Sequence, residues 1–509
     1  MPRDVDAYYL RLYLHSACMI THSNLHMPIV TELDLLKYRR TKILATVGPA
    51  SSTPETIAQL IIAGVDVFRV NMSHGEHADH RAAIIAIREI AAHQEVHTAI
   101  LADLCGPKIR TGKFAGGSVQ LEAGTNVTVT SREVIGDKTI IPSQYAGLVN
   151  DVVVGNRILL NDGAVELNVI DVSGTEVACV VKAGGVVGDH KGINLPGVDV
   201  SAPSLTDKDR LDVDFSLQMK VDFLALSFVR SAVDIMRLRK IVDRAPWQPM
   251  IIAKIEKPEA LTNTSAILAA ADGIMVARGD LGVELNPEQV PLVQNQLIRW
   301  AVAVNKPVIV ATQMLESMIV SARPTRAEVT DVAHAVGSAA DAVMLSGETA
   351  VGKHPVAAVE MMDRIARQTE SYTWQQSATT RVETILSAQA VPFGDAFADA
   401  VAKLVQDTRA RAVLVISNRG MTAATISAAR PKAPVIAISR EASTCRRMNL
   451  MWGVVPHLDG NVGKSNPTSI ARGVAKTLKL ADTGEFVVLV RGFHSDPLMN
   501  TPTMTLITV

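Results

Sequence analysis

The chain has 509 residues, of which 48% are hydrophobic and 4% aromatic, and its formal net charge is −1. This length exceeds the ~250 to 300 residues at which a single hydrophobic core stops growing, so more than one domain is expected. The balanced charge gives no support for nucleic acid or an anionic membrane as the main partner, and no apolar run approaches the ~20 residues of a membrane helix.

The first segment, residues 1–38, is interpreted as an N-terminal arm of unknown role. Its apolar stretch "YYLRLYLHSACMI" resembles a signal peptide, but Asp4 and Asp6 precede it and Arg11 and His15 interrupt it. The 4 cysteines of the chain are far apart and form no C-x-x-C pair, which predicts neither a zinc site nor a disulfide framework. A reducing, cytoplasmic compartment fits this cysteine usage.

From residue 41 onward, short β-branched runs alternate with helical patterns, which is typical of parallel strands joined by helical crossovers. The runs are nearly continuous in apolar residues, as expected for strands covered on both faces. Eight such strands predict a (β/α)8 TIM barrel, which belongs to the α/β class. The predicted strands span residues 41–48, 65–73, 97–104, 222–229, 250–256, 273–280, 307–313 and 341–346.

Two further domains are predicted from breaks in this alternation. A β-rich stretch of about a hundred residues, far longer than an ordinary βα loop, separates the third and fourth strands. We interpret residues 109–204 as an inserted all-β domain, a β-barrel that acts as a lid, so the TIM barrel comprises 39–108 and 205–370. Residues 371–509 begin with a charge-poor linker, 372–394, and then read as a C-terminal doubly wound α/β domain.

Polar side chains fall at the C-terminal ends of nearly all the predicted barrel strands. In a barrel of this kind these ends meet at one rim, where the chemistry takes place. A single serine or aspartate at a strand end often only caps a helix or closes a turn, but a full set on one face predicts a functional site. The set comprises Arg69, Asn71, Ser73, Asp103, Ser227, Lys254, Glu256, Arg278, Asp280, Thr312, Gln313, Ser346 and Glu348.

Three of these residues indicate the kind of chemistry. Lys254 and Glu256 lie two residues apart on one strand, so their side chains project to the same face, and Asp280 ends the next strand. Carboxylates on neighbouring strand ends, with no histidine or cysteine beside them, suit a hard cation such as Mg²⁺. The alternative is a plain Lys254–Glu256 salt bridge that closes the rim.

Glycines and cations extend this site. Gly279 and Gly282 leave backbone amides bare around Asp280, where a strand turns into a helix and an anion can bind. Arg69 together with Arg110 and Lys191 from the insert adds the positive charge that a transferring phosphoryl group needs. A metal site, an anion site and a cation cluster predict chemistry on a phosphorylated acid.

At this point the chain resembles the pyruvate kinase family, from about residue 40 to near the C-terminus. The motifs that carry the resemblance are, in order, "RRTKILATVGPAS", "FRVNMSHG", "GPKIRTG", "KGINLPG", "IIAKIEKPEAL", "GIMVARGDLGVE", "ATQMLESM", "RPTRAEVTDVAHAV" and "DAVMLSGETA". The resemblance implies a cytoplasmic glycolytic enzyme, usually a homotetramer, that makes pyruvate and ATP from phosphoenolpyruvate and ADP. It also implies the barrel, the lid and the C-terminal domain.

The resemblance assigns a role to each matching residue. Glu256 and Asp280 resemble the ligands of a Mg²⁺ or Mn²⁺ ion that binds phosphoenolpyruvate, whose carboxylate rests on the amides of Gly279, Asp280 and the Thr312 loop. Lys254 resembles the lysine that neutralises the phosphoryl group in flight and then the enolate. The other implied roles are phosphate binding (Arg69), proton relay to the enolate (Thr312, Ser346, Glu348), a monovalent-cation site (Asn71, Ser73, Asp103, the Leu104 carbonyl) and nucleotide binding (Pro49, Asn71, His74, Arg110, Lys191).

The chain departs from the family pattern at residue 108, where potassium-dependent members carry glutamate. Lys108 places an ammonium there, and Leu104 also fits the potassium-independent subgroup. We therefore expect activity without K⁺. The alternative is a solvated lysine beside an intact potassium site.

An effector site is expected in the C-terminal domain. "SNRGMT", residues 417–422, follows a predicted strand and opens a helix, the place where regulated relatives bind a phosphorylated effector. Ser417, Arg419 and Thr422 are the candidate phosphate contacts. Asn418 and Arg419 depart from the "TxSGxT" pattern of relatives, so the resemblance leaves the effector unidentified.

Three functional hypotheses remain open at the level of sequence. The leading one is an ATP-forming phosphotransferase. A Mg²⁺-dependent lyase or aldolase acting on a pyruvate enolate would use the same carboxylates, but it would need neither the lid nor Arg110 and Lys191. A catalytically silent regulatory paralogue would lack site residues, whereas all the matched ones are present.

Overall fold

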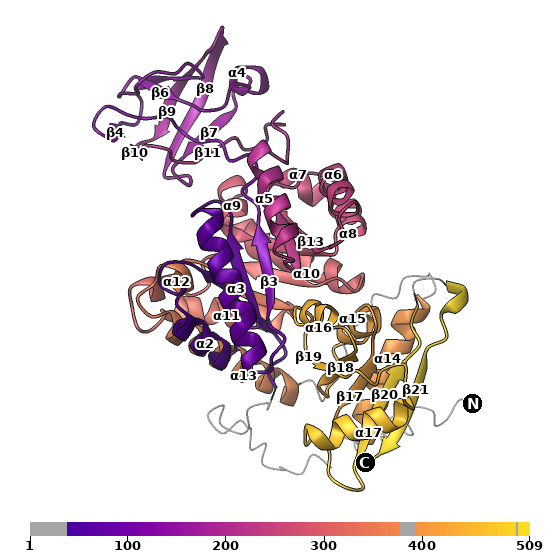
Figure 1. Cartoon of the computed structure of the whole chain (residues 1–509). Helices are drawn as coiled ribbons and strands as arrows, with labels where there is room; N and C mark the ends of the chain where they lie inside the picture. The colour runs from indigo at the N-terminus through magenta and orange to yellow at the C-terminus, as the bar shows by residue number, and fades with distance from the viewer. Residues whose placement is uncertain (1–37, 377–391, 495–496) are drawn as a thin grey trace, which may run out of the picture.

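The computed structural model describes residues 38–376, 392–494 and 497–509. The predicted N-terminal arm therefore lies outside the described residues except for Tyr38, and so does most of the predicted linker, at 377–391. Figure 1 shows the inserted domain at one end of the molecule, the barrel in the middle and the C-terminal domain at the other end.

None of the helices in these three ranges combines the length and the hydrophobicity that a membrane span requires.

The central domain is a closed barrel of parallel strands, as predicted. The strands follow one another around the barrel in the order β1, β16, β15, β14, β13, β12, β3, β2. Each lies inside one of the eight segments predicted from the sequence. They are β1 (Lys42–Val47), β2 (Val67–Asn71), β3 (Ala99–Asp103), β12 (Phe223–Leu226), β13 (Met250–Ile255), β14 (Gly273–Ala277), β15 (Val308–Ala311) and β16 (Ala342–Leu345).

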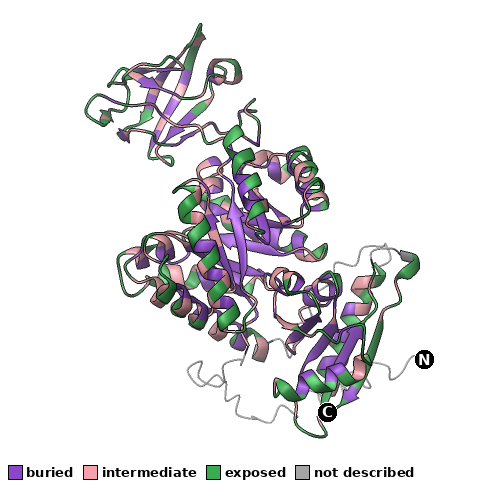
Figure 2. Ribbon diagram, in the orientation of Figure 1, coloured by how far each residue is buried: buried purple, intermediate pink, exposed green. Residues whose placement is uncertain are grey.

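The strands are apolar throughout because both of their faces are covered. Successive side chains of a strand point to opposite faces. In β1, Leu44 therefore packs in the cluster inside the barrel, whereas Ile43 and Ala45 join the cluster beneath the helices. Figure 2 shows the buried strands enclosed by helices whose outer faces are exposed.

The helices of this domain connect the strands and cover the barrel. Local sequence sets their ends: α2 begins after Thr53, whose side chain accepts a hydrogen bond from the Thr56 amide, and ends at Gly64 with a left-handed φ of 115°. The helices are α2 (Pro54–Ala63), α3 (His77–His93), α5 (Asp207–Gln218), α6 (Ala232–Val242), α7 (Pro258–Thr262), α8 (Thr264–Ala270), α9 (Arg278–Glu284), α10 (Val290–Ala303), α11 (Arg326–Gly337), α12 (Gly347–Ala350) and α13 (Pro355–Gln376), with 3-10 turns η2 (Pro287–Gln289) and η3 (Glu316–Ile319).

The insert between β3 and α5 is a β-domain with its own core. Its strands form a six-stranded sheet, β11-β7-β8-β9-β5-β6, and a two-stranded sheet, β10-β4. We expected a β-barrel, but ladder hydrogen bonds do not close the strands into one barrel; residues of both sheets share a single core instead. The elements are β4 (Ser118–Leu121), β5 (Asn126–Thr130), β6 (Ile140–Pro142), the helical turn α4 (Leu148–Asp151), β7 (Arg157–Leu160), β8 (Val165–Ser173), β9 (Glu176–Ala183), β10 (Gly185–Gly188) and β11 (Ile193–Asn194).

The C-terminal domain is doubly wound, as predicted. Its sheet has the order β19-β18-β17-β20-β21, and only β21 runs antiparallel to its neighbour. One face packs on α14, α15 and α16 and the other on α17. Neither β19 nor the edge strand β21 was predicted from the sequence. The elements are α14 (Phe393–Thr408), β17 (Val413–Ile416), α15 (Met421–Ala428), β18 (Val435–Ser439), α16 (Ala442–Met448), β19 (Val454–Leu458), α17 (Pro467–Thr477), β20 (Phe486–Arg491), η4 (Pro497–Met499) and β21 (Thr503–Thr508).

The C-terminal domain closes the end of the barrel where the strands begin. Asp222, just before β12, pairs with Arg446 at 2.9 Å, and Asp341, just before β16, pairs with Arg430 at 3.0 Å. Leu450 of the C-terminal domain joins the apolar cluster inside the barrel. The opposite rim, at the carboxyl ends of the strands, is therefore the one that faces the insert (Figure 1).

The helix α13 continues through Gln376, beyond the boundary that we predicted at 370. Trp374, in the last turns of this helix, lies against the C-terminal domain, with the Lys432 ammonium 5.7 Å from the centre of its ring. The other domain boundaries remain predictions.

Candidate active site

The predicted lysine stands at the centre of a buried polar cluster on the barrel rim. Lys254, near the end of β13, places its Nζ 2.9 Å from Glu256 Oε1 and 3.2 Å from Asp103 Oδ1. The ammonium also donates a hydrogen bond of 2.8 Å to Ser227 Oγ. Asp103 Oδ2 receives Arg69 Nε at 2.7 Å. The structure thus brings together side chains from β2, β3, β13 and the end of β12.

Lys254 and Asp103 stabilise each other in their ionised forms. Burial alone would lower the pKa of Lys254, but the carboxylates of Asp103 and Glu256 outweigh it and raise that pKa above its ordinary value. Burial would raise the pKa of Asp103, yet the charges of Lys254 and Arg69 lower it. Lys254 therefore remains an ammonium across the physiological pH range.

Glu256 is the member of the cluster whose negative charge is not fully balanced by its surroundings. Burial raises its pKa and the nearby charge of Asp280 raises it further, while Lys254 opposes both effects. Its Oε2 accepts the Phe228 amide at 2.6 Å. Its buried Oε1 accepts no well-aligned hydrogen bond from any described residue, although the Lys254 Nζ lies 2.9 Å away and forms an ion pair with it.

These observations fit a divalent cation. Glu256 offers a buried carboxylate oxygen that faces the Lys254 ammonium, and the Asp280 carboxylate is close enough to repel it. The described residues contain no group of three or more histidine, cysteine or acidic side chains that would enclose a metal by themselves. Mg²⁺ is typically held by one or two carboxylates with water and substrate oxygens in the remaining positions. The pair thus suits Mg²⁺ or Mn²⁺ shared with a substrate.

Asp280 lies in the first turn of α9, which begins directly after β14. The strand-to-helix transition that the sequence predicted is present, but the Gly279 amide is already engaged, since it donates to Thr312 Oγ1 at 2.7 Å. A methyl group at Gly279 would lie 3.4 Å from that same hydroxyl oxygen. The hydrogen bond between Gly279 and Thr312 thus joins α9 to the Thr312 loop.

The Thr312 loop has an unusual backbone. Thr312 and the following Gln313 have φ values of 71° and 54°, in the left-handed region that non-glycine residues seldom occupy. The Arg278 guanidinium holds the loop by donating to the Thr312 carbonyl at 2.7 Å, and it also pairs with Asp331 at 2.6 Å. Strained backbone of this kind persists where its surroundings fix it, often at functional sites.

The three residues predicted to relay a proton lie on neighbouring segments without direct hydrogen bonds between their side chains. The Glu348 carboxylate accepts the Ser346 amide at 2.7 Å and the Leu315 amide at 3.0 Å. The Thr312 hydroxyl donates to the Ala311 carbonyl at 2.6 Å. The Ser346 hydroxyl is buried and makes no hydrogen bond within the described chain. Burial raises the pKa of Glu348.

The residues of the expected monovalent-cation site are adjacent, but they are largely occupied. Asn71 and Asp103 are register partners on β2 and β3, and Asn71 Oδ1 accepts the Ser73 amide at 3.1 Å. Both oxygens of Asp103 face cationic side chains, and the Leu104 carbonyl accepts the Ser227 hydroxyl at 2.6 Å. Asp103 thus faces two cationic side chains, and monovalent-cation binding at these residues stays a prediction.

The predicted nucleotide contacts are divided between the barrel and the insert. Arg110 and Lys191 lie on paired segments at the base of the insert, where Arg110 bridges to Gly192 and its guanidinium donates to the His190 carbonyl at 3.0 Å. Pro49 and His74 are exposed on barrel loops, and Asn71 is partly buried on the rim. A ligand that touches both groups would span the space between barrel and insert.

The predicted effector loop has the expected position in the C-terminal domain, between β17 and α15. Ser417 is buried and its Oγ accepts the Gly420 amide at 3.1 Å. Thr422 is also buried, while Arg419 is exposed. The serine thus has a structural role in the turn, and phosphate binding at this loop stays a prediction.

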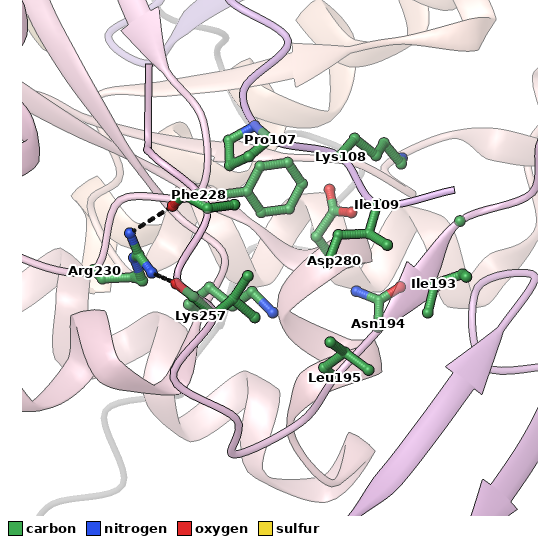
Figure 3. A pocket seen from close by; sticks show the side chains of 13 residues that line it. Pro107, Lys108, Ile109, Ile193, Asn194, Leu195, Phe228, Arg230, Lys257 and Asp280 are labelled. Atoms are coloured by element: carbon green, nitrogen blue, oxygen red, sulfur yellow. Dashed lines mark hydrogen bonds between the residues drawn. The ribbon is translucent and has the colours of Figure 1, made fainter. Parts of the chain in front are cut away.

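A small cavity lies where the insert meets the barrel (Figure 3). Its volume is about 40 Å³ and its lining includes Asp280, Lys257 and Phe228 from the barrel together with Lys108 and Asn194. The Lys108 side chain reaches toward the insert, where its Cε would lie 3.7 Å from a methyl group at Gly192.

Two groups that form hydrogen bonds within this site were not predicted from the sequence. The Phe228 amide donates a hydrogen bond to Glu256, and Phe228 has a left-handed φ of 53°. A phenylalanine in the sequence does not predict this backbone conformation. Thr46 Oγ1 accepts a hydrogen bond of 3.1 Å from Arg69 Nη1, and the position of Thr46 near the end of β1 could have placed it on the rim in advance. Ser227 was noted on the rim, but its bond to Lys254 was not anticipated.

A profile described as "Pyruvate kinase, barrel domain" matches residues 38–359, and one described as "Pyruvate kinase, alpha/beta domain" matches residues 395–507. Pyruvate kinase 2 of Synechocystis is 44% identical over 459 residues, covering 89% of this chain and 76% of the relative. The pyruvate kinase of Clostridium acetobutylicum is 39% identical over 461 residues, covering 89% and 96%. The crystal structure of a pyruvate kinase from Cryptosporidium parvum superimposes with a TM-score of 0.85 at 35% identity, covering 93% of this chain and 98% of that one. With both of its principal domains matched and the residues of the barrel rim in place, this chain belongs to the pyruvate kinase family.

Proposed function

We propose that this protein transfers the phosphoryl group of phosphoenolpyruvate to ADP, giving pyruvate and ATP. The observation that carries the proposal is the Lys254 ammonium, held within 3.2 Å of the carboxylates of Asp103 and Glu256 on the rim that also carries Asp280. This arrangement sets a fixed positive charge beside Glu256, which together with Asp280 is suited to hold a divalent ion. Both features serve a reaction in which negative charge moves from one oxygen to another.

In the proposed reaction an oxygen of the ADP β-phosphate attacks the phosphorus of phosphoenolpyruvate in line. A new P–O bond forms as the bond to the enol oxygen breaks, and the bonding electrons leave with the enolate. Lys254 faces first the phosphoryl oxygens and then the enolate oxygen, and Arg69 adds a second cation on the same side. Because these charges are already oriented, little reorganisation is needed during transfer.

Glu256 and Asp280 are the residues proposed to hold Mg²⁺ or Mn²⁺. When bound, such an ion withdraws charge from the substrate oxygens and keeps them in one orientation. Gly279, Asp280 and the Thr312 loop would border the substrate carboxylate.

Protonation of the enolate methylene carbon completes the reaction. Thr312, Ser346 and Glu348 are proposed to deliver this proton, with water between them because their side chains do not bond directly. The raised pKa of Glu348 makes that carboxyl a better proton reservoir near neutrality than an ordinary glutamate.

The nucleotide is proposed to bind between the barrel and the insert, with Arg110 and Lys191 on its phosphates and with Asn71, His74 and Pro49 on the barrel side. The insert then acts as a lid that excludes water during transfer.

We further propose that the enzyme works in the cytoplasm as a homotetramer and needs no K⁺. A phosphorylated effector is proposed to bind near Ser417, Arg419 and Thr422.

The test is a purified-protein assay with phosphoenolpyruvate, ADP and MgCl₂ in which pyruvate and ATP are measured separately. Equal amounts of the two products, both dependent on ADP, are expected. Pyruvate without ATP, or pyruvate formed in the absence of ADP, would point to hydrolysis with water as the phosphoryl acceptor. Formation of neither product would contradict the proposed function.

A further inference from the structure

Glu284, which has no role in the mechanism above, is a buried carboxylate where the insert meets the barrel. It is the last residue of α9, and its side chain is 1% exposed. Its Oε1 receives the Lys257 ammonium at 2.5 Å and the Asn194 side-chain amide at 3.1 Å. We call these three residues the lid junction. A charged group buried in this way is costly unless its partners are well placed.

The two barrel members of the lid junction lie next to the proposed metal ligands in the chain. Lys257 directly follows Glu256, and Glu284 lies one helical turn after Asp280, on the same face of α9. The strands that lead to them, β13 and β14, are neighbours in the barrel, with Ile255 opposite Val276. The Lys257–Glu284 ion pair therefore ties together the two segments whose carboxylates must share one ion.

The third member of the lid junction belongs to the insert. Asn194 lies in β11, which pairs with β7 of the large sheet of the insert. Figure 3 shows the Lys257 and Asn194 side chains facing each other across the cavity that Asp280 also lines. Movement of the insert away from the barrel would withdraw Asn194 from Glu284.

From this geometry we propose that Glu284 is a positioning residue that couples the position of the insert to the separation of Glu256 and Asp280. With Asn194 in place, the Glu284 carboxylate is held against Lys257 and the two metal-binding segments keep their spacing. Without Asn194, the Glu284 carboxylate loses one of the two side chains that bind its Oε1. Glu284 then holds Lys257 less firmly, and the distance between Glu256 and Asp280 is less fixed. Residues that orient metal ligands in this way commonly affect metal affinity about 10- to 100-fold. The proposal rests on the proposed function, because it assumes that Glu256 and Asp280 bind the ion.

The test measures Mn²⁺ binding by electron paramagnetic resonance, with phosphoenolpyruvate present and without turnover. Asn194→Ala removes only a partly buried side chain of the insert, yet we expect it to raise the Kd for Mn²⁺ about tenfold. Asn194→Asp should raise it further, because two carboxylates would then meet. Glu284→Gln should raise it at least as much as Asn194→Ala, and in that background Asn194→Ala should add less than about twofold.

Two matched controls separate this role from general damage. Asn156→Ala removes an asparagine whose 2.7 Å bond to the Val153 amide stays within the insert. Asp272→Asn breaks the 2.7 Å ion pair with Arg239 at the other end of β14. Both should leave the Kd for Mn²⁺ within about twofold of wild type.

Steady-state kinetics give a second measurement. In Asn194→Ala and Glu284→Gln, the Mg²⁺ concentration for half-maximal rate should rise about tenfold, while kcat at saturating metal stays within about threefold. A Kd for Mn²⁺ within twofold of wild type in Asn194→Ala would overturn the inference, even if Glu284→Gln fails to fold. Inactivity of the wild-type protein would instead contradict the proposed function.

Discussion

Replacing Lys254 with methionine tests the central charge of the site. Methionine has a similar length but no ammonium, so the hydrogen bond to Ser227 and the contacts with Asp103 and Glu256 are lost together. A unit charge about 3 Å from an ammonium interacts with about 5 kcal/mol at an effective dielectric constant of about 20. Removal of one preorganised donor costs about 3 to 4 kcal/mol in enzymes of known mechanism. We therefore expect kcat for phosphoryl transfer to fall about 10²- to 10⁴-fold.

The same variant should still bind the divalent ion. Loss of Lys254 removes a competing positive charge from Glu256, so the Kd for Mn²⁺ should stay unchanged or decrease. Breaking a buried ion pair costs about 3 to 5 kcal/mol of unfolding free energy. We expect the lower end here, since Arg69 still pairs with Asp103. Urea unfolding and electron paramagnetic resonance measure these two quantities on the protein used for kinetics.

Lys42→Met is the matched control for this experiment. Lys42 is also buried and lies 3.4 Å from Asp66, but at the start of β1, on the opposite end of the barrel. It should lower stability by a comparable amount and leave kcat within about threefold when folded. Near-normal turnover in Lys254→Met, or an equal loss of turnover in Lys42→Met, would refute the role given to Lys254.

Three further predictions concern other parts of the molecule. Lys108 adds a positive charge of its own, and Asp103 already pairs with Arg69 and Lys254. We therefore expect the rate in K⁺-free buffer to equal the rate with KCl. A rate that collapses without K⁺ and recovers on adding KCl would contradict this. Thr312→Val should lower kcat about tenfold or more, because it removes a hydroxyl proposed to deliver the proton and leaves the Gly279 amide without its acceptor, whereas Thr312→Ser should keep a rate near that of the wild type; equal rates in both variants would argue against the hydroxyl. Burial raises the pKa of Cys179 to about 12 and that of Cys445 to about 11, so peptide mapping after treatment with a thiol reagent at pH 8 should find both unmodified in the native protein and modified in urea, and rapid modification in the native state would contradict their burial.

Much of the architecture was predictable because the barrel strands are regular. Each is an apolar run with turn residues at its ends, and the alternation of Leu44 inside the barrel with Ile43 and Ala45 outside follows from strand geometry alone. The edge strand β21 was missed because "TMTLIT" has a largely exposed surface and no continuous apolar run. β19 contains Pro456 and His457, which weaken its strand pattern.

The candidate site was only partly predictable from strand ends. The period of two residues in a strand placed Lys254 and Glu256 on one face, and their ion pair is present. Backbone conformation was beyond sequence reasoning: the left-handed φ of Phe228 turns an amide toward Glu256. The lid junction was missed for a related reason. Asn194, Lys257 and Glu284 come from three distant segments, so their contact depends on how the insert docks on the barrel.

The most direct measurement is the anomalous diffraction of Mn²⁺ in crystals grown with phosphoenolpyruvate. We predict one strong peak at the barrel rim, within about 2.0 to 2.3 Å of carboxylate oxygens from both Glu256 and Asp280, with substrate oxygens completing its coordination. The Lys254 ammonium should contact the phosphoryl group of the same substrate molecule. An ion bound without Glu256 and Asp280, or a phosphoryl group out of reach of Lys254, would contradict the account.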